Sequence, residues 1–419
     1  MAVRVSTLAN GLRVISDELS TVETASVGVW VGVGTRHEPA RLNGISHLLE
    51  HMAFKGTTSR SAYRIAEEIE NVGGHLNAYT SRELTAYYAK ILKEDLGLAL
   101  DIIADILQNS TFEAEELARE QAVVVQEISQ ALDTPDDIIF DHFQATAYPD
   151  QPMGRPVLGT AEIVRGLTSD DLRGYLASNY TASNMVLSAA GRVNHEDLVA
   201  RAQAVFGGLA TSAPPAQEKA RYAGGDFRED KDLEQVQLVL GFDGVTYDDP
   251  DFYAASVLAS VLGGGMSSRL FQEVREKRGL VYSIYAYSSS YDDGGLFGVY
   301  AGTGAEEVRT LMPVVCDEIS KLADGISADE VARSKAQFKA GLLMSLESTS
   351  SRCEQIARQL MIYGRPQTTE EIIAEIEAVS ERDLIRVAER LLKSAPTFAA
   401  LGPLTGVEDY PGLSRRLAG

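Results

Sequence analysis

Apolar and polar residues alternate along the chain with two different periods, and each period predicts one kind of element. Apolar residues at every second position predict β-strands, whereas apolar residues three or four positions apart predict helices with one buried face. The first strands, in residues 3–16, are joined by Asn10-Gly11, which favours a tight hairpin turn. In the first half we predict further strands at residues 25–33, 75–89 and 184–191, and helices at residues 44–54, 62–72, 93–108, 113–132, 136–147, 160–166 and 169–179.

The second half repeats the order of these elements. We predict strands at residues 235–242, 281–287 and 296–301, and helices at residues 251–262, 267–278, 306–323 and 327–346. Residues 327–333 are similar to residues 113–119, so that Ala328 corresponds to Ala114 at an offset of 214 residues, and residues 369–391 echo residues 160–176. The pattern indicates an internal duplication, with domains at residues 1–212 and 227–419 and a linker at residues 213–226 that contains two prolines.

Composition and charge narrow the class of protein. The 419 residues are enough for two or more domains, each with its own core. The 60 acidic and 38 basic residues leave a formal net charge of −22, which argues against nucleic acid as a partner. The same charge fits the attraction of basic peptides, although a solvated acidic surface is the simpler explanation. Cys316 and Cys353 lack the spacing of a metal site, and a reducing compartment is the simplest interpretation.

Targeting and membrane segments are not expected. The chain starts directly with a strand-like pattern, without an apolar segment or an amphipathic basic leader. No stretch contains the ~18 apolar residues that a membrane-spanning helix needs. We therefore expect a cytoplasmic bacterial protein without a membrane span, or an organellar matrix protein whose leader has been removed.

The candidate chemistry is concentrated in His47-Leu48-Leu49-Glu50-His51. Two histidines four residues apart project from one face of a helix, so both imidazoles can bind one small ion, for which Zn²⁺ is the natural candidate. Glu50 could take a proton from a metal-bound water. This H-x-x-E-H order is typical of inverted zinc peptidases. The alternative is that both histidines are packed residues of an apolar helix.

A catalytic zinc site usually has three protein ligands and one water, so a third ligand is needed. Glu127 is a candidate, because Val123, Val124, Val125 and Ile128 around it predict a buried stretch of helix, where a carboxylate needs a partner. The alternative is a glutamate on the polar edge of that helix. Glu120 lies two turns before Glu127, and the second copy has Ser334 and Gly341 at the corresponding positions.

The motif and the distal glutamate resemble the pitrilysin and mitochondrial processing peptidase family of inverted zinc metallopeptidases. The resemblance covers nearly the whole chain, including its two halves. It implies that His47, His51 and Glu127 bind zinc and that Glu50 is the general base. It also implies that Glu120 supports catalysis, and an α+β fold of two homologous α/β-sandwich domains, each a mostly antiparallel sheet covered by helices.

The resemblance extends to residues that contact substrate. The strand with Asn77 and Ala78 is similar to the family's edge strand, which binds extended peptides by β-addition. Arg278 and Tyr282 resemble an Arg–Tyr pair that contacts substrate from the second domain. Taken alone, Arg278 could be the cation at a helix end and Tyr282 a packed strand aromatic. Heterodimeric members carry the zinc motif and this pair on different subunits, so their presence in one chain suggests a homodimer.

The expected function is that of a zinc metalloendopeptidase cleaving peptides, including basic ones, or leader segments similar to presequences. Two alternatives stay open: a non-catalytic structural subunit of the same fold, and a protein that binds extended peptides without cutting them. The complete set of His47, Glu50, His51 and Glu127 favours the enzyme, because scaffold members of the family tend to lack part of it.

Overall fold

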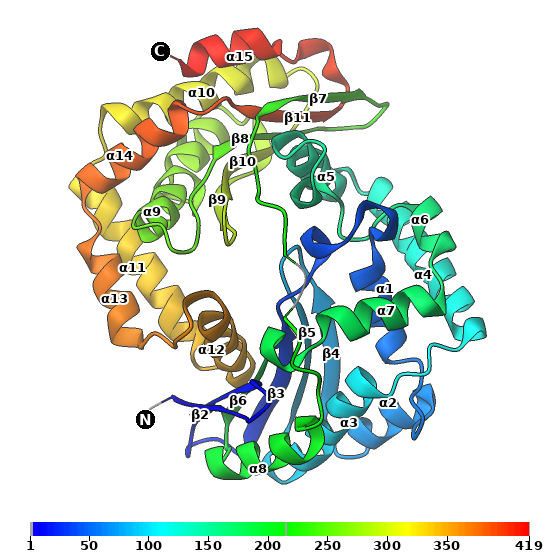
Figure 1. The fold of residues 1–419 in the computed structure, drawn as a ribbon. Coiled ribbons are helices and arrows are strands. Elements are labelled where there is room, and N and C mark those ends of the chain that lie inside the picture. Colours follow the sequence, from blue (N-terminus) through cyan, green and yellow to red (C-terminus); the bar gives the residue numbers. More distant parts are fainter. Residues whose placement is uncertain (1–2, 214–215, 419) are drawn as a thin grey trace. The chain divides into compact units, whose positions relative to one another are not determined.

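The computed structural model describes residues 3–213 and 216–418, which form two compact units. Unit 1 consists of Met1–Ser129, Arg155–Glu218 and Leu343–Gln367, and unit 2 consists of Gln130–Gly154, Lys219–Leu342 and Thr368–Gly419 (Figure 1). Each unit is therefore assembled from three separate segments of the chain. In the linker that we predict, Pro214-Pro215 lies outside the described residues.

The sheet of unit 1 has six strands in the order β1-β2-β6-β3-β5-β4. Their bounds are β1 Arg4–Thr7, β2 Arg13–Glu18, β3 Thr24–Val31, β4 His75–Thr80, β5 Thr85–Leu92 and β6 Met185–Gly191. β2 and β6 are parallel, and all other neighbours are antiparallel. The hairpin turn at Asn10-Gly11 is confirmed, since Gly11 has a φ of +93° and Asn10 Oδ1 accepts a hydrogen bond from the Leu12 amide.

The single strand predicted at residues 75–89 is wrong, because the structure has a hairpin of β4 and β5 there. The chain turns at Ser81, whose amide and hydroxyl both donate to the carbonyl of Leu84, at 2.8 and 2.9 Å. The polar residues between the strands form this turn although the apolar alternation continues on both sides. The turn leaves β4 as an edge strand of the sheet.

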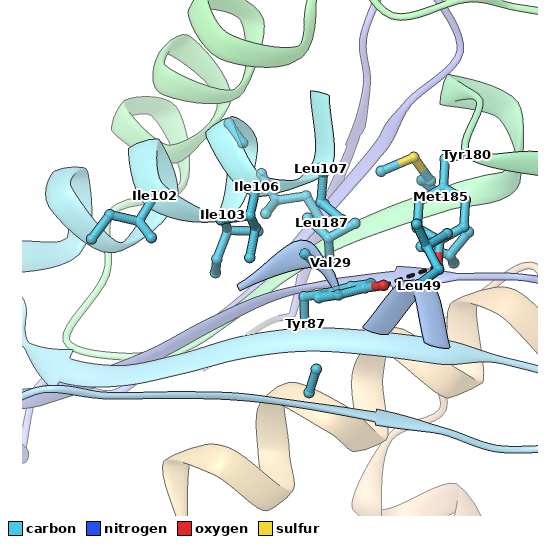
Figure 2. Packing of buried hydrophobic residues seen from close by; sticks show 14 of the residues in the cluster. Val29, Leu49, Tyr87, Ile102, Ile103, Ile106, Leu107, Tyr180, Met185 and Leu187 are labelled. Atoms are coloured by element: carbon cyan, nitrogen blue, oxygen red, sulfur yellow. Dashed lines mark hydrogen bonds between the residues drawn. The ribbon is translucent and has the colours of Figure 1, made fainter. Parts of the chain in front are cut away.

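One face of this sheet carries the main core of unit 1. The helices of this core are α1 Ile45–Ala53, α2 Ala62–Glu70, α3 Leu96–Gln108, α4 Ala114–Leu132, α6 Ala161–Gly166, α7 Ser169–Asn179 and α8 His195–Phe206. The apolar stripe of α3, with Ile103 and Leu107, packs toward Val29 of β3 and Tyr87 of β5 (Figure 2). The hydroxyls of Tyr87 and Tyr180 are hydrogen-bonded at 3.1 Å, so the polar ends of both buried rings are satisfied.

The opposite face of the sheet is covered by α12 (Thr349–Tyr363), which packs on β2, β3 and β6 (Figure 1). Trp30 is only 2% exposed beneath this helix. Ile356 and Leu360 belong to the same cluster, together with Ile15 and Val186. A helix from the second half of the sequence thus completes the unit that contains the first half.

Unit 2 contains a five-stranded sheet in the order β7-β11-β8-β10-β9. The strands are β7 Gly225–Asp230, β8 Val236–Asp243, β9 Val281–Ser290, β10 Gly295–Thr303 and β11 Thr397–Gly402. The helices are α9 Phe252–Gly263, α10 Val308–Asp324, α11 Ala328–Ser345, α13 Thr369–Ala378, α14 Glu381–Leu392 and α15 Tyr410–Leu417, with a π-helix, η6, at Phe271–Glu276. One face of this sheet is covered by α5 (Pro135–Ala147), which packs on β7, β8 and β11.

The two sheets have the same strand order once β1 is set aside, with β4 and β9 as corresponding edge strands. The first residues of α5 and α12, Pro135 and Thr349, differ by the same 214 residues that separate Ala114 from Ala328. The duplicated helices are therefore exchanged: α5, from the first half of the sequence, covers the sheet of unit 2, and α12, from the second half, covers the sheet of unit 1. The α+β class and the two mostly antiparallel sheets covered by helices are confirmed.

Several elements were not predicted from the sequence, namely α8, β7, α12, β11 and α15. In β11 every residue is buried, so the strand shows no polar alternation that would mark it. The predicted helix at residues 267–278 contains the π-helical turns of η6. Among the described residues, no helix combines the length and apolar composition that crossing a membrane requires.

Candidate metal centre

The helix α1 carries the H-x-x-E-H residues, and a buried glutamate from the preceding loop caps it. Glu38 Oε2 accepts a hydrogen bond from the Gly44 amide at 2.7 Å, and Oε1 accepts one from the Ser46 amide at 2.8 Å. Gly44 has a φ of +95°, a conformation that favours glycine. Burial raises the pKa of Glu38, which these hydrogen bonds oppose. The cap satisfies amides at the helix N-terminus and fixes where α1 begins.

The imidazole Nε2 atoms of His47 and His51 face the same carboxylate oxygen. His47 Nε2 lies 3.7 Å and His51 Nε2 3.6 Å from Glu127 Oε2, which belongs to α4. One donor atom from each residue lies within 4.8 Å of the others. In residues 3–213 and 216–418, no other His, Cys, Asp or Glu residues form such a group of three.

This donor set fits a zinc ion. A tetrahedral zinc ion with bonds of ~2.1 Å separates its ligand atoms by ~3.4 Å, so small side-chain rotations would bring the three atoms to bonding distance. Burial, and then the nearby charge of His51, lower the pKa of His47 to about 4. His47 is therefore neutral at pH 7, which is the form in which imidazole binds a metal.

Glu50 lies beside this group and is held by Thr80, the last residue of β4. The Thr80 hydroxyl donates to Glu50 Oε2 at 2.6 Å. Burial raises the pKa of Glu50; the Thr80 hydrogen bond and the charge of His51 oppose this rise, and the charge of Glu127 adds to it. Glu50 is thus a partly desolvated carboxyl group that interacts electrostatically with two of the three candidate ligands.

The expectation that Glu127 is buried is wrong. Its side chain is 37% exposed, and the neighbouring Val123 is 39% exposed. Glu120, two turns earlier, is the buried carboxylate, with a side chain only 8% exposed. It accepts a hydrogen bond from His51 Nδ1 at 3.0 Å and pairs with Lys55 Nζ at 2.7 Å. Valines on several sides of a helix could not show which of its faces lies inward.

Asn77 and Ala78 lie on the edge strand β4. Asn77 is exposed and Ala78 is 8% exposed. The Asn77 Oδ1 atom accepts a hydrogen bond from the Ala78 amide at 2.8 Å. An edge strand offers backbone groups that an extended peptide can pair with.

Comparisons with known proteins show the family of the chain. A sequence profile described as "Insulinase (Peptidase family M16)" matches residues 13–161, and one described as "Peptidase M16 inactive domain" matches residues 166–338. An uncharacterized zinc protease of Rickettsia felis is 40% identical over 400 residues, covering 95% of this chain and 97% of the relative. The chain belongs to peptidase family M16.

Other proteins that are similar to this chain have different names. A probable mitochondrial-processing peptidase subunit beta of Arabidopsis thaliana is 41% identical over 429 residues, covering 99% of this chain and 81% of the relative. A protease from Helicobacter pylori has a TM-score of 0.89 at 25% identity, with 96% and 99% of the two chains covered. A chain of complex III2 from Candida albicans also has a TM-score of 0.89, at 24% identity, covering 99% of this chain and 100% of that one, and shows the shared fold alone.

Unit 2 holds the other two residues that the family resemblance singles out. The Arg278 guanidinium donates to the carbonyl of Glu273 at 2.6 Å and to its carboxylate at 2.8 Å. Tyr282 lies on the edge strand β9 and is 79% exposed. The guanidinium of Arg275 lies 5.2 Å from the Tyr282 ring centroid and 4.8 Å from that of Phe271. The tyrosine is therefore not the packed aromatic that a strand position alone suggests.

Three residues of the site were missed by sequence reasoning: Glu38, Lys55 and Thr80. Lys55 follows His51 by four residues, so helical spacing could have placed it on the same face. Glu38 precedes α1 by a short loop, where acidic caps are common. The position of Thr80 in the sequence could not have predicted its contact with Glu50, because β4 lies beside α1 only in the tertiary structure.

Proposed function

We propose that this chain is a zinc-dependent metalloendopeptidase that cleaves peptides or leader segments similar to presequences. The observation that carries the proposal is the convergence of His47 Nε2 and His51 Nε2 on one oxygen of Glu127. Membership of peptidase family M16 and relatives named zinc proteases support it. We assign the three ligand positions to His47, His51 and Glu127.

Zinc, when bound, acidifies water and polarises the carbonyl group of the scissile peptide bond. We assign to Glu50 the transfer of a proton from the attacking water to the leaving amine. Because Thr80 occupies Oε2 of Glu50, Oε1 is the oxygen that we expect to take the proton. Glu120 orients the His51 ring through its hydrogen bond to Nδ1.

For substrate binding we propose that an extended peptide adds as a strand alongside Asn77 and Ala78 of β4. We assign further substrate contacts to Arg278 and Tyr282, an assignment that rests on the family resemblance. The net charge of −22 favours basic peptides. Salt should therefore raise the KM of a basic peptide, and a KM independent of salt would argue against this preference.

Separate variants test the metal ligands and the general base that we propose. Elemental analysis of the purified protein should find about one zinc per chain. The zinc should be absent from His47→Ala. It should be retained in the matched control His142→Ala, because His142 lies in unit 2. Glu50→Gln should keep both zinc and the fold but lose turnover of a mixed peptide library by about 10²-fold or more. A His47→Ala protein with full zinc content would refute the metal site. Wild-type turnover by Glu50→Gln would refute the base.

A further inference from the structure

Lys55 is a charged residue beside the candidate metal centre to which the function above assigns no part. Its ammonium group lies 2.7 Å from Glu120 Oε1, while Glu120 Oε2 lies 3.0 Å from His51 Nδ1. We propose that Lys55 is a positioning residue: it holds the Glu120 carboxylate in the orientation that aligns the His51 ring for the metal. This inference rests on the proposed zinc site and names a residue that tunes it.

Glu120 needs an opposite charge nearby. Its side chain is only 8% exposed, and a buried carboxylate without a partner is costly. A neutral imidazole offers a hydrogen bond but no charge. Lys55 supplies the charge while its own side chain stays 31% exposed, so that the ammonium remains partly hydrated.

The geometry of the Glu120 carboxylate links Lys55 to His51. A carboxylate has two oxygens in one plane, and here each has its own partner. With Oε1 bound to the ammonium, Oε2 is directed at His51 Nδ1. An ionised carboxylate can only accept a hydrogen bond, so this pairing favours the His51 tautomer with the proton on Nδ1 and the lone pair on Nε2. Nε2 is the atom that faces Glu127, at 3.6 Å.

The two histidines differ in what holds their rings. In the described part of the chain, His47 Nδ1 is buried and has no hydrogen-bond partner, so no second side chain orients its ring through that atom. His51 is the imidazole whose orientation depends on a second side chain, and that side chain depends on Lys55. Losing Lys55 should therefore weaken the metal site through His51.

Zinc affinity, measured on the full chain by competition with a chelator, tests this inference. Lys55→Met should weaken zinc binding by about tenfold, in the range typical of residues that orient metal ligands. Lys55→Arg should restore affinity to within about threefold of wild type, because it keeps the charge. Lys93→Met is the matched control, since it removes the same charge from an exposed ion pair with Glu23. Lys55→Gln makes the same comparison if methionine prevents folding.

A double mutant tests whether Lys55 acts through Glu120. Lys55→Met combined with Glu120→Gln should bind zinc no more weakly than Glu120→Gln alone. Independent, additive losses would overturn the inference, as would a Lys55→Met protein with wild-type affinity while His47→Ala loses zinc. Retention of zinc by His47→Ala would instead overturn the proposed function itself, so the two failures are distinguishable.

Discussion

Thr80 connects a residue of the edge strand with the carboxyl group of Glu50. Its hydroxyl donates to Glu50 Oε2 at 2.6 Å, a short distance typical of a hydroxyl bound to a carboxylate. This bond favours the ionised form of Glu50 and so opposes the burial that raises its pKa. It also fixes which way the carboxylate plane points. The base that we propose thus depends on a neutral residue on a different element.

At the residue scale we predict that Thr80→Val lowers kcat by about tenfold, because a hydrogen bond to a charged group is worth about 1.5–3 kcal/mol. Zinc content should not change. Thr80→Ser is the control, since it keeps the hydroxyl and should retain most of the activity. Steady-state kinetics on one peptide, with zinc measured on the same samples, make the comparison. A valine variant with wild-type kcat would show that Glu50 needs no such support.

At the scale of elements, the exchanged helices α5 and α12 decide how each sheet is covered. Trp30 is the only tryptophan of the chain, and it is 2% exposed beneath α12. Ile356 and Leu360 of α12 belong to the same buried cluster. A fragment that ends before α12 would leave this face of the sheet bare although it contains all six strands of unit 1.

We therefore predict that residues 1–218 alone have red-shifted tryptophan emission, because Trp30 meets water. Adding a peptide of residues 343–367 should shift the emission back to the blue. The control peptide carries Ile356→Ala and Leu360→Ala and should have no effect, because each of these substitutions in a buried cluster costs about 2–5 kcal/mol. Emission from the fragment alone that equals that of the full chain would contradict the role of α12.

At the scale of the whole molecule, the residues to which we assign roles are divided between the two units. The zinc ligands that we propose lie in unit 1, whereas Arg278 and Tyr282 lie in unit 2. The copy in unit 2 has Ser334 and Gly341 where unit 1 has Glu120 and Glu127. One chain carries both sets of residues.

We accordingly predict a homodimer. Light scattering should give a mass of about twice the 45.3 kDa of one chain. Dilution below the dissociation constant of the dimer should then lower the activity per chain, because the dimer, which we predict to be the active form, separates into single chains. A monomeric protein that is fully active at all concentrations would contradict this assembly.

Local spacing along the sequence by itself determined the features that a single helix or turn specifies. His47, Glu50 and His51 share one helical turn whatever surrounds it, because the helical period is a property of the backbone. The Asn10-Gly11 turn is equally local, and the offset of 214 residues is written in the chain. The two-domain α+β fold followed from these patterns together with the family resemblance.

Only the tertiary structure decided which distant groups meet. The burial of Glu120 rather than Glu127 depends on which face of α4 packs inward, and valines on several of its faces did not reveal this. Spacing could place Lys55 on the face of His51, but its pairing with Glu120 of α4 is a tertiary contact, as is the hydrogen bond of Thr80 to Glu50. The exchange of α5 and α12 was equally hidden, since an amphipathic helix shows that one face must be buried but not which sheet covers it.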